Sequence, residues 1–302
     1  MRILVAGSSG FLGRPLVEHL RARDHDVVRL VRREASAEDE STWDPYAGEL
    51  DRGLVRTADV VVNLAGASNK GNPHSRRWGE ALLHSRVTTT KVLAEAVAEA
   101  GSPPTYVVGV GTSAYGDQGA AVVTEESPDR GGDALLARVV RAWEEAARPA
   151  LEAGGRVALM RTAPIVHPGN VPTQQLIPLF QCYLGGRVGR GGQYFPVVSL
   201  EDWKSAATFL AENDVPSGPY NVCCPTTPTH REFVEALAQQ LHRPAPFVVP
   251  TKLLEIAMGQ LSPELTNSTN LRPAALLREG FVFHDDDVAD VVATALAARR
   301  RP

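Results

Sequence analysis

The stretch Gly7-Ser8-Ser9-Gly10-Phe11-Leu12-Gly13 decides the fold of this chain. It directly follows the apolar run 3–6 and opens a segment of helical periodicity over residues 11–23. Glycines let the backbone turn tightly and approach a pyrophosphate, whose charge the helix N-terminus stabilises. A tight turn that binds nothing is the alternative. Because strand, turn, helix and second strand follow in register, the pattern favours dinucleotide binding.

Apolar runs of strand length alternate with helical patterns through the first half of the chain. Strands are expected at 3–6, 27–31, 60–64, 106–110 and 157–161, and helices at about 11–23, 78–100 and 134–153. Such alternation is typical of βαβ units around a parallel sheet that is buried on both faces. It predicts an α/β fold with a Rossmann-type doubly wound parallel sheet.

Shorter elements rich in proline and glycine follow from about residue 163. They are typical of a substrate-binding lobe. Thr229 and Glu232 form a capping box that opens a helix to about residue 242, and Asp285–Asp287 starts a last helix. We therefore expect an NADP-binding Rossmann domain over 1–165 and a smaller, mainly substrate-binding lobe over 166–302, from which some segments return to the first domain.

Composition excludes several classes of protein. Of 302 residues, 43% are hydrophobic and 22% charged, and the net charge of -4 argues against a nucleic-acid partner, which needs a basic face. No run is long enough to span a membrane, and the apolar N-terminal run is too short for a signal peptide. Three cysteines without paired or metal-ligand spacing fit a reducing cytoplasm and predict no metal site. The sequence is compatible with a homodimer.

The second predicted strand ends in Arg32 and Arg33. Proteins specific for NAD usually place an acid about twenty residues past the glycines, where it accepts hydrogen bonds from the ribose hydroxyls. A carboxylate there would repel a 2′-phosphate, whereas a guanidinium can bind it bidentately. The pair therefore favours NADP over NAD as the cofactor, against the alternative that both arginines are merely solvated.

Short motifs along nearly the whole chain resemble those of a known family. They are Gly7–Gly13, Trp43-Asp44-Pro45 with Gly48, Asn63-Leu64-Ala65-Gly66, Arg77-Trp78, Ser85-Arg86, Tyr115-Gly116-Asp117, Trp143-Glu144, Arg161-Thr162, Gly192-Gln193-Tyr194, Glu201-Asp202 and Gly280-Phe281. In this order they resemble the atypical extended short-chain dehydrogenase/reductases, which are labelled an epimerase family. Each motif is short, but their joint spacing is specific.

The resemblance implies how a cofactor and a substrate would be bound. It implies NADP contacts at Gly7, Ser9, Gly10, Phe11, Leu12, Arg32, Arg33, Leu64, Ala65 and Gly66. It further implies that Ala163, Pro164 and Val166 lie against the nicotinamide, and that Gln193, Tyr194 and Trp203 line a cleft closed by C-terminal segments. The small-molecule substrate is expected to be a specialised one, because Phe195-Pro196 and 265–270 depart from the family pattern.

The superfamily's usual Tyr-x-x-x-Lys dyad is absent. In that dyad a lysine lowers the tyrosine pKa so that the phenol can exchange a proton with the substrate oxygen. Alignment on Trp143-Glu144 puts Leu136 at the tyrosine position and Val140 at the lysine position, and Arg86 replaces a helix asparagine. The family that the chain resembles also tends to lack the dyad.

Three hydroxyl residues after the strand 106–110 are candidates for catalysis. Thr112 and Ser113 end that strand, and a hydroxyl there could donate to a developing oxyanion, with turn capping as the alternative. Tyr115 could replace the missing phenol, or it could form part of a turn. Lys70, His74, Arg76 and Arg77 form a loop that could contact an anionic substrate or be a charged surface loop.

The leading hypothesis is an NADPH-dependent oxidoreductase that reduces a small or medium organic carbonyl, enone or imine. One alternative is a nucleotide-sugar epimerase, and another is a non-redox cyclase or isomerase on the same fold. A different class is a regulatory protein that senses NADPH without turnover.

Overall fold

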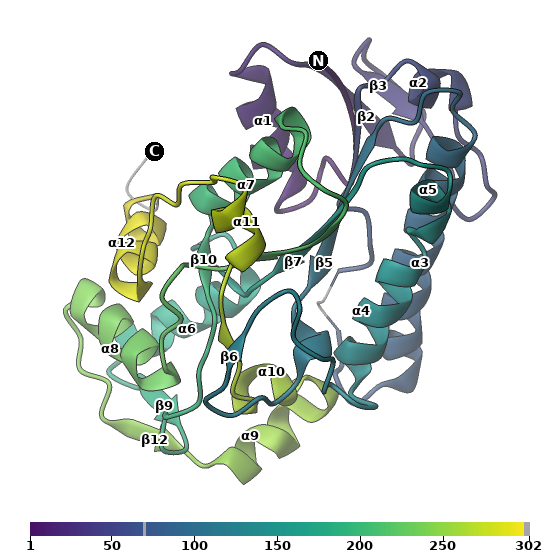
Figure 1. Ribbon diagram of the computed structural model, residues 1–302. Coiled ribbons are helices and arrows are strands. Elements are labelled where there is room, and N and C mark those ends of the chain that lie inside the picture. The colour runs from purple at the N-terminus through teal and green to yellow at the C-terminus, as the bar shows by residue number, and fades with distance from the viewer. Residues whose placement is uncertain (69–70, 299–302) are drawn as a thin grey trace. The chain divides into compact units, whose positions relative to one another are not determined.

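A seven-stranded sheet forms the centre of the computed structural model, which describes residues 1–68 and 71–298. The strand order is β11-β7-β5-β4-β1-β2-β3 (Figure 1). The strands are β1 (Arg2–Ala6), β2 (Asp26–Val31), β3 (Glu40–Thr42), β4 (Val60–Asn63), β5 (Thr105–Gly111), β7 (Val157–Thr162) and β11 (Gly218–Val222). β1 pairs in parallel with β2 and β4, and β4 pairs in parallel with β5. The predicted Rossmann-type sheet is thereby confirmed.

Burial explains why β1 lies inside the sheet. Ile3, Leu4, Val5 and Ala6 are all 0% exposed, so both faces of this strand are covered. A continuous apolar run is the pattern of such a strand, because successive side chains point to opposite faces. β3 was not expected, because it lies at the sheet edge and its sequence, Glu40-Ser41-Thr42, carries no apolar run.

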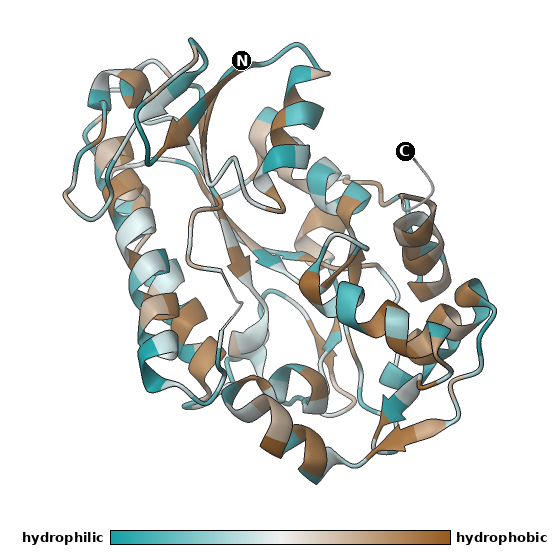
Figure 2. Ribbon diagram, turned by 180° about the vertical axis from the view of Figure 1, so that it is seen from behind, coloured by the Kyte–Doolittle hydropathy of each residue, from teal (hydrophilic) through white to brown (hydrophobic). Residues whose placement is uncertain are grey.

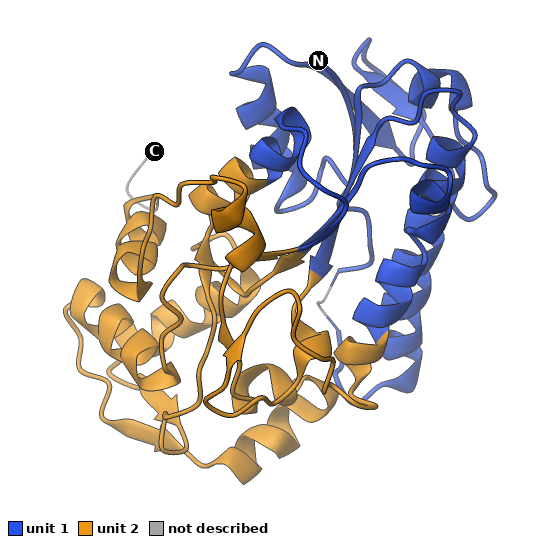
Figure 3. Cartoon of the chain, viewed as in Figure 1, with its two compact units in different colours: residues 1–110, 139–160, 207–219 blue, residues 111–138, 161–206, 220–302 orange. Residues whose placement is uncertain are grey.

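Chain contacts divide the protein into two compact units (Figure 3). Unit 1 comprises residues 1–110, 139–160 and 207–219, and unit 2 comprises residues 111–138, 161–206 and 220–302. Several elements, among them β5 and β7, pass from one unit into the other along the chain. The functional division into a nucleotide domain and a substrate lobe stays a prediction, because compactness does not assign a function.

Helices cover the sheet of unit 1. α1 (Gly13–Arg21) lies on one side, and α3 (Arg76–Ala98) and α5 (Arg148–Glu152) pack together on the other (Figure 1). The helix expected over 134–153 is divided into α4 (Leu135–Glu145) and α5, because Pro149 has no backbone N–H to continue the hydrogen-bond ladder. The remaining short helix, α2 (Arg52–Arg56), is capped by Asp51.

Unit 2 is built from short elements, as the sequence predicted. Its parallel two-stranded sheets pair β8 with β10, β9 with β12 and β6 with β13. These strands are β6 (Val122–Val123), β8 (Ile165–Val166), β9 (Gly186–Val188), β10 (Val198–Ser199), β12 (Phe247–Val249) and β13 (Asn270–Leu271). The helices are η1 (Ser113–Tyr115), α6 (Val171–Gln181), α7 (Leu200–Glu212, which runs on into unit 1), α8 (His230–Leu241), α9 (Thr251–Met258), η2 (Gly259–Leu261), α10 (Pro263–Thr266), α11 (Ala274–Arg278) and α12 (Val288–Ala298).

α8 and α12 pack against each other and supply much of the core of unit 2. The capping box of Thr229 and Glu232 is present at the start of α8, as predicted. Buried residues from these helices include Phe233, Leu237 and Val292. Most helices show both hydrophilic and hydrophobic residues along the ribbon (Figure 2), as expected for helices with one face in a core.

Among the described residues, no helix combines the length and the apolar composition that crossing a membrane would require.

His230 gives unit 2 a pH-dependent stability. The ring is 6% exposed, lies 5.4 Å from the Phe195 ring centroid, and has its pKa lowered by burial to about 4. Between about pH 6.5 and pH 4 the His230 ring is protonated in the unfolded chain but not in the folded chain. The free energy of unfolding therefore falls as the pH drops from about 6.5 towards 4. We expect His230→Phe to reduce the loss of unfolding free energy between about pH 7 and pH 4.5 by about 2 kcal/mol.

Urea denaturation at both pH values measures this difference. His242→Asn is the matched control, because His242 ends the same helix but is exposed and left-handed, a conformation that Asn tolerates. An equal effect of both substitutions on the pH dependence would contradict the prediction.

Candidate functional site

The glycine turn, residues 7–13, joins β1 to α1 by close backbone contacts. Gly7 has a φ of +79°, and a Cβ on it would lie 2.6 Å from the carbonyl carbon of Leu64. A Cβ on Gly13 would lie 2.1 Å from the Gly7 carbonyl oxygen. Gly10 is exposed, and its N–H donates to the Gly7 carbonyl oxygen at 3.0 Å. Gly7 and Gly13 are therefore needed to form the turn. Gly10 lies on the exposed side of the turn, where the absence of a side chain leaves the backbone accessible.

The segment after β4 is held beside the glycine turn by α3. Asn63 is fully buried, its amide donates to Thr90 Oγ1 at 2.8 Å, and its carbonyl accepts from the Ala65 N–H at 3.0 Å. Thr89 Oγ1 donates to the Ala65 carbonyl at 3.0 Å. The predicted contact residues Leu64, Ala65 and Gly66 thus form a rigid wall of the turn.

Arg86 lies behind this wall. Its guanidinium donates to the Ala67 carbonyl at 3.2 Å and lies 5.0 Å from the centroid of the Trp143 ring. Burial lowers its pKa to about 10. A Cβ on Gly66 would lie 3.2 Å from the Arg86 Cγ, so this glycine lets the arginine stem pass. Arg86 therefore supports the backbone of residues 66–67.

The two arginines at the end of β2 differ in their partners. Arg33 binds both carboxylate oxygens of Glu40, at 2.5 and 2.8 Å, and the Glu40 side chain is 1% exposed. These contacts lower the pKa of Glu40 to about 2. Arg32 is exposed and has no ion-pair partner within residues 1–68 and 71–298. Of the two predicted cations, only Arg32 is free to bind an added anion.

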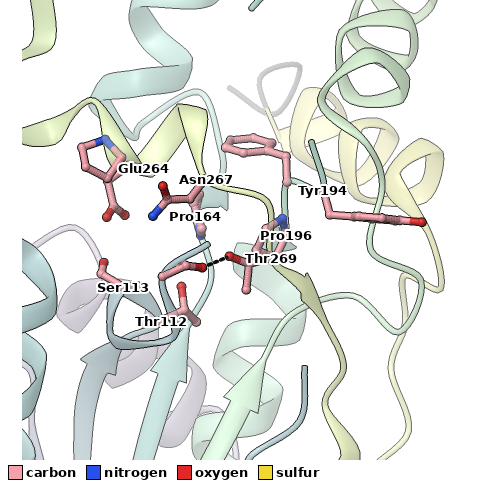
Figure 4. A pocket seen from close by; sticks show the side chains of 11 residues that line it. Thr112, Ser113, Pro164, Tyr194, Pro196, Glu264, Asn267 and Thr269 are labelled. Atoms are coloured by element: carbon pink, nitrogen blue, oxygen red, sulfur yellow. Dashed lines mark hydrogen bonds between the residues drawn. The ribbon is translucent and has the colours of Figure 1, made fainter. Parts of the chain in front are cut away.

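A second candidate region, the Ser113 pocket, lies within unit 2 (Figure 4). Its lining residues come from the loop after β5, the segment before β8, the loop before β10, and α10 with the residues that follow it. They are Thr112, Ser113, Gly116, Pro164, Tyr194, Phe195, Pro196, Pro263, Glu264, Asn267 and Thr269. The sequence-predicted Thr112, Ser113 and Pro164 are therefore brought together.

The polar wall of the Ser113 pocket is formed by η1 and α10. Thr112 precedes η1, whose turn is closed by the Tyr115 N–H donating to the Thr112 carbonyl at 3.1 Å. Glu264 lies in the first turn of α10, and its side chain lines the pocket together with that of Ser113. Figure 4 shows the two groups facing each other. Burial raises the pKa of Glu264, and the nearby Ser113 hydroxyl opposes that shift.

Tyr115 lies beneath the pocket and does not line it. It is 1% exposed, its hydroxyl donates to Asn221 Oδ1 at 2.8 Å, and it accepts from Arg161 at 2.8 Å. Burial raises its pKa to about 12, although Arg161 opposes the shift. The Asn221 N–H donates to Glu125 at 2.9 Å. This network ties the loop after β5 to β7 and β11, so the structure favours a positioning role for Tyr115.

The other residues singled out from the sequence are distributed as follows. Ala163 and Val166 are buried, at 1% and 4% exposure, beside the pocket residue Pro164. Trp203 is fully buried, with its indole N–H donating to Thr162 at 3.1 Å, and Gln193 donates to the Leu265 carbonyl at 3.1 Å. Neither lines the Ser113 pocket.

Of the basic loop, Lys70 lies outside the described residues. His74 and Arg77 are exposed, and Arg76 pairs with Glu80 at 2.9 Å. In the described part of the chain no cluster of three potential metal ligands occurs.

Glu264 was missed by the sequence analysis. A glutamate just after Ser262-Pro263 has the pattern of an ordinary first-turn residue of a helix. Glu264 faces Ser113, which lies about 150 positions earlier in the chain, and a local sequence pattern cannot predict such a contact.

The glycine turn makes a stability prediction. We expect Gly13→Ala to lower the unfolding free energy by about 1 to 3 kcal/mol. The new Cβ would overlap backbone atoms of Gly7 and Ser8, which cannot move aside as a flexible side chain could. Gly10→Ala is the matched control, since the nearest atom to its Cβ would be 3.2 Å away. Chemical denaturation without added nucleotide measures both, and equal losses would refute the distinction.

Comparison with known proteins identifies a matching family and similar relatives. The family model described as NAD dependent epimerase/dehydratase family matches residues 3–223, and a domain of unknown function matches residues 249–295. An epimerase family protein of Mycobacterium leprae is 38% identical over 298 residues, which cover 97% of this chain and 95% of the relative.

Solved structures extend the likeness. The crystal structure of human epimerase family protein SDR39U1 with NADPH has a TM-score of 0.87 and 28% identity, covering 98% of this chain and 99% of the human one. A nucleoside-diphosphate sugar epimerase from Corynebacterium glutamicum has a TM-score of 0.80 and 31% identity, covering 99% of this chain and 58% of that chain. With its parallel sheet, glycine turn and these matches, the chain belongs to the NAD dependent epimerase/dehydratase family.

Proposed function

We propose that this protein is an NADPH-dependent oxidoreductase that reduces a small or medium organic carbonyl, enone or imine. The observation that carries the proposal is the unpaired Arg32 at the end of β2, beside an Arg33 that Glu40 already occupies. A free guanidinium at this position of a Rossmann-type fold suits the 2′-phosphate that distinguishes NADP from NAD. The human relative, solved with NADPH, supports the same cofactor.

The residues of the glycine turn fit a dinucleotide. Gly10 presents no Cβ at the exposed face of the turn, and α1 begins just after it, so the positive end of the helix dipole favours a pyrophosphate there. We assign the cofactor contacts to Gly7, Ser9, Gly10, Phe11, Leu12 and Arg32, with Leu64, Ala65 and Gly66 as the wall. Arg33 contributes through Glu40 and Arg32 rather than by direct contact.

The nicotinamide is assigned to Ala163, Pro164 and Val166. Pro164 also lines the Ser113 pocket, so a ring held against this segment has the pocket beside it. When bound, NADPH supplies the hydride. Thr112 and Ser113 then offer hydroxyls to the substrate oxygen, and Phe195 and Pro196 form an apolar wall that limits water.

The pocket lining favours the reductase over a nucleotide-sugar epimerase. None of the eleven lining residues is lysine, arginine or histidine, and Glu264 is acidic. A sugar diphosphate would find no counter-charge among them, whereas an uncharged carbonyl compound needs none. The name of the Corynebacterium relative nevertheless makes the epimerase the second candidate.

Turnover experiments separate these functions. The purified protein is incubated with NADPH and a panel of ketones, enones, imines and nucleotide sugars, while cofactor loss and product are both measured. A reductase consumes one NADPH for each product formed. Conversion of a sugar nucleotide without net loss of cofactor would instead identify the epimerase, and tight binding without any conversion would identify the sensor.

Replacement of Arg32 tests the cofactor assignment. We expect Arg32→Ala to weaken NADP binding by about 10- to 100-fold, because a charge-assisted contact with the 2′-phosphate is worth about 1.5 to 3 kcal/mol. NAD affinity stays the same. Arg33→Ala is the matched control, with a change in NADP affinity below about threefold, because the Arg33 guanidinium is already bound by Glu40. Calorimetric titration measures all four affinities, and a larger loss for Arg33→Ala would reverse the assignment.

A further inference from the structure

We propose that Glu264 is the proton source of the reduction and that it acts through the hydroxyl of Ser113. The inference rests on the proposed reductase activity and names the acid that this site uses. It concerns a residue that no sequence motif marks and that stands about 150 positions from Ser113. Its basis is the opposition of a carboxyl group and a hydroxyl group across one pocket.

Geometry brings both groups to the same space. Ser113 follows the carboxyl end of β5, and Glu264 projects from the first turn of α10. Their side chains face each other in Figure 4, and both line the pocket. The Thr269 hydroxyl donates to the Gly116 carbonyl at 2.9 Å and so fixes the chain that follows α10 against the loop after β5. This hydrogen bond therefore helps to hold Glu264 and Ser113 on facing sides of the pocket.

The surroundings favour the acid form of Glu264. Burial raises its pKa, and the neighbouring Ser113 hydroxyl opposes that shift. Tyr194 is the other titratable lining residue, and its phenol points away from the carboxylate in Figure 4. No cation lines the pocket that would stabilise the carboxylate. A glutamate in such a site can hold a proton at a pH where an exposed glutamate has lost it.

The proton transfer balances as follows. A hydride from bound NADPH, which would be oxidised to NADP⁺ as its own C–H bond breaks, forms a C–H bond at the substrate carbon, and the electron pair of the C=O double bond passes to oxygen. That oxygen takes the hydroxyl proton of Ser113, and Ser113 takes the carboxyl proton of Glu264. Glu264 is left as a carboxylate, and a proton from water restores it before the next turnover. No co-reactant other than NADPH and water is required.

In this arrangement Glu264 and Ser113 take the place of the missing Tyr-x-x-x-Lys dyad as the source of the proton. Leu136 and Val140 cannot exchange protons, and Tyr115 is engaged with Arg161 and Asn221. The common dyad lowers the pKa of a phenol, whereas burial in this pocket raises the pKa of a carboxyl group. Both arrangements supply a proton donor for the substrate oxygen, one by lowering the pKa of a phenol and the other by raising the pKa of a carboxyl group.

Infrared spectroscopy of the protein without cofactor tests the protonation state. At about pH 6, well above the ordinary glutamate pKa of about 4.3, we expect a carboxylic acid C=O band that Glu264→Gln abolishes. Glu255→Gln is the matched control, because Glu255 is exposed on the neighbouring helix α9. Absence of a protonated Glu264 at that pH overturns the inference, whatever the protein reduces.

Kinetics test the role of the proton. We expect Glu264→Gln to lower kcat by about 10²- to 10⁴-fold with unchanged NADPH affinity, because glutamine has nearly the same size as glutamate but no acidic proton. In the wild type kcat falls as pH rises and Glu264 ionises, and the variant loses this limb. Ser113→Ala, which removes the relay, gives a similar loss. A Glu264→Gln protein with wild-type kcat and pH profile overturns the inference.

The two proposals fail in different ways. If the wild type oxidises no NADPH with any substrate, the reductase proposal fails and this inference fails with it. If the wild type turns over but Glu264→Gln does so equally well, only the inference fails. Thermal unfolding of each variant shows whether a loss of kcat reflects a loss of fold.

Discussion

Direct contact between backbones at the glycine turn is the constraint on which the rest of unit 1 depends. Gly7 approaches Leu64, and Gly13 approaches Gly7, so closely that a single Cβ at either position would overlap main-chain atoms. This contact sets the start of α1 and the segment after β4 at one edge of the sheet. The proposed pyrophosphate site lies where three features coincide: an open turn, a helix N-terminus and a rigid wall.

Charge placement refines this site. Arg29, Arg33, Asp39 and Glu40 bind one another along β2 and β3, so these charges are largely satisfied within the fold. Arg32 stands next to this network and takes no part in it. A cation left over beside satisfied neighbours is a better ligand for an added phosphate than one that must first leave a carboxylate. In the proposed cofactor assignment, Glu40 at the start of the edge strand β3 thus leaves Arg32 rather than Arg33 to bind the phosphate.

The proposed proton route through the Ser113 pocket would place new chemistry on a retained fold. Leu136 and Val140 stand on α4 where the superfamily's dyad was expected, and Val140 is only 3% exposed, so this part of the helix contributes packing. In the proposed route the acid comes instead from α10, in the C-terminal part of the chain. Fold and function are separable for this reason, and the site has to be argued from its own groups.

Sequence and tertiary structure determined different parts of this protein. The sequence alone established the parallel sheet, the glycine turn, the capped helix α8 and the hydroxyls at the end of β5, because each depends on neighbours within a few residues or on a repeating pattern. It could not establish the edge strand β3, which lacks an apolar run, or the division at Pro149, where helical periodicity continues on both sides. Only the tertiary structure separated Arg32 from Arg33, buried Tyr115 and brought Glu264 to Ser113. Those outcomes depend on partners distant in sequence or on the packing around them, and the pKa and availability of a side chain follow from those surroundings rather than from its type.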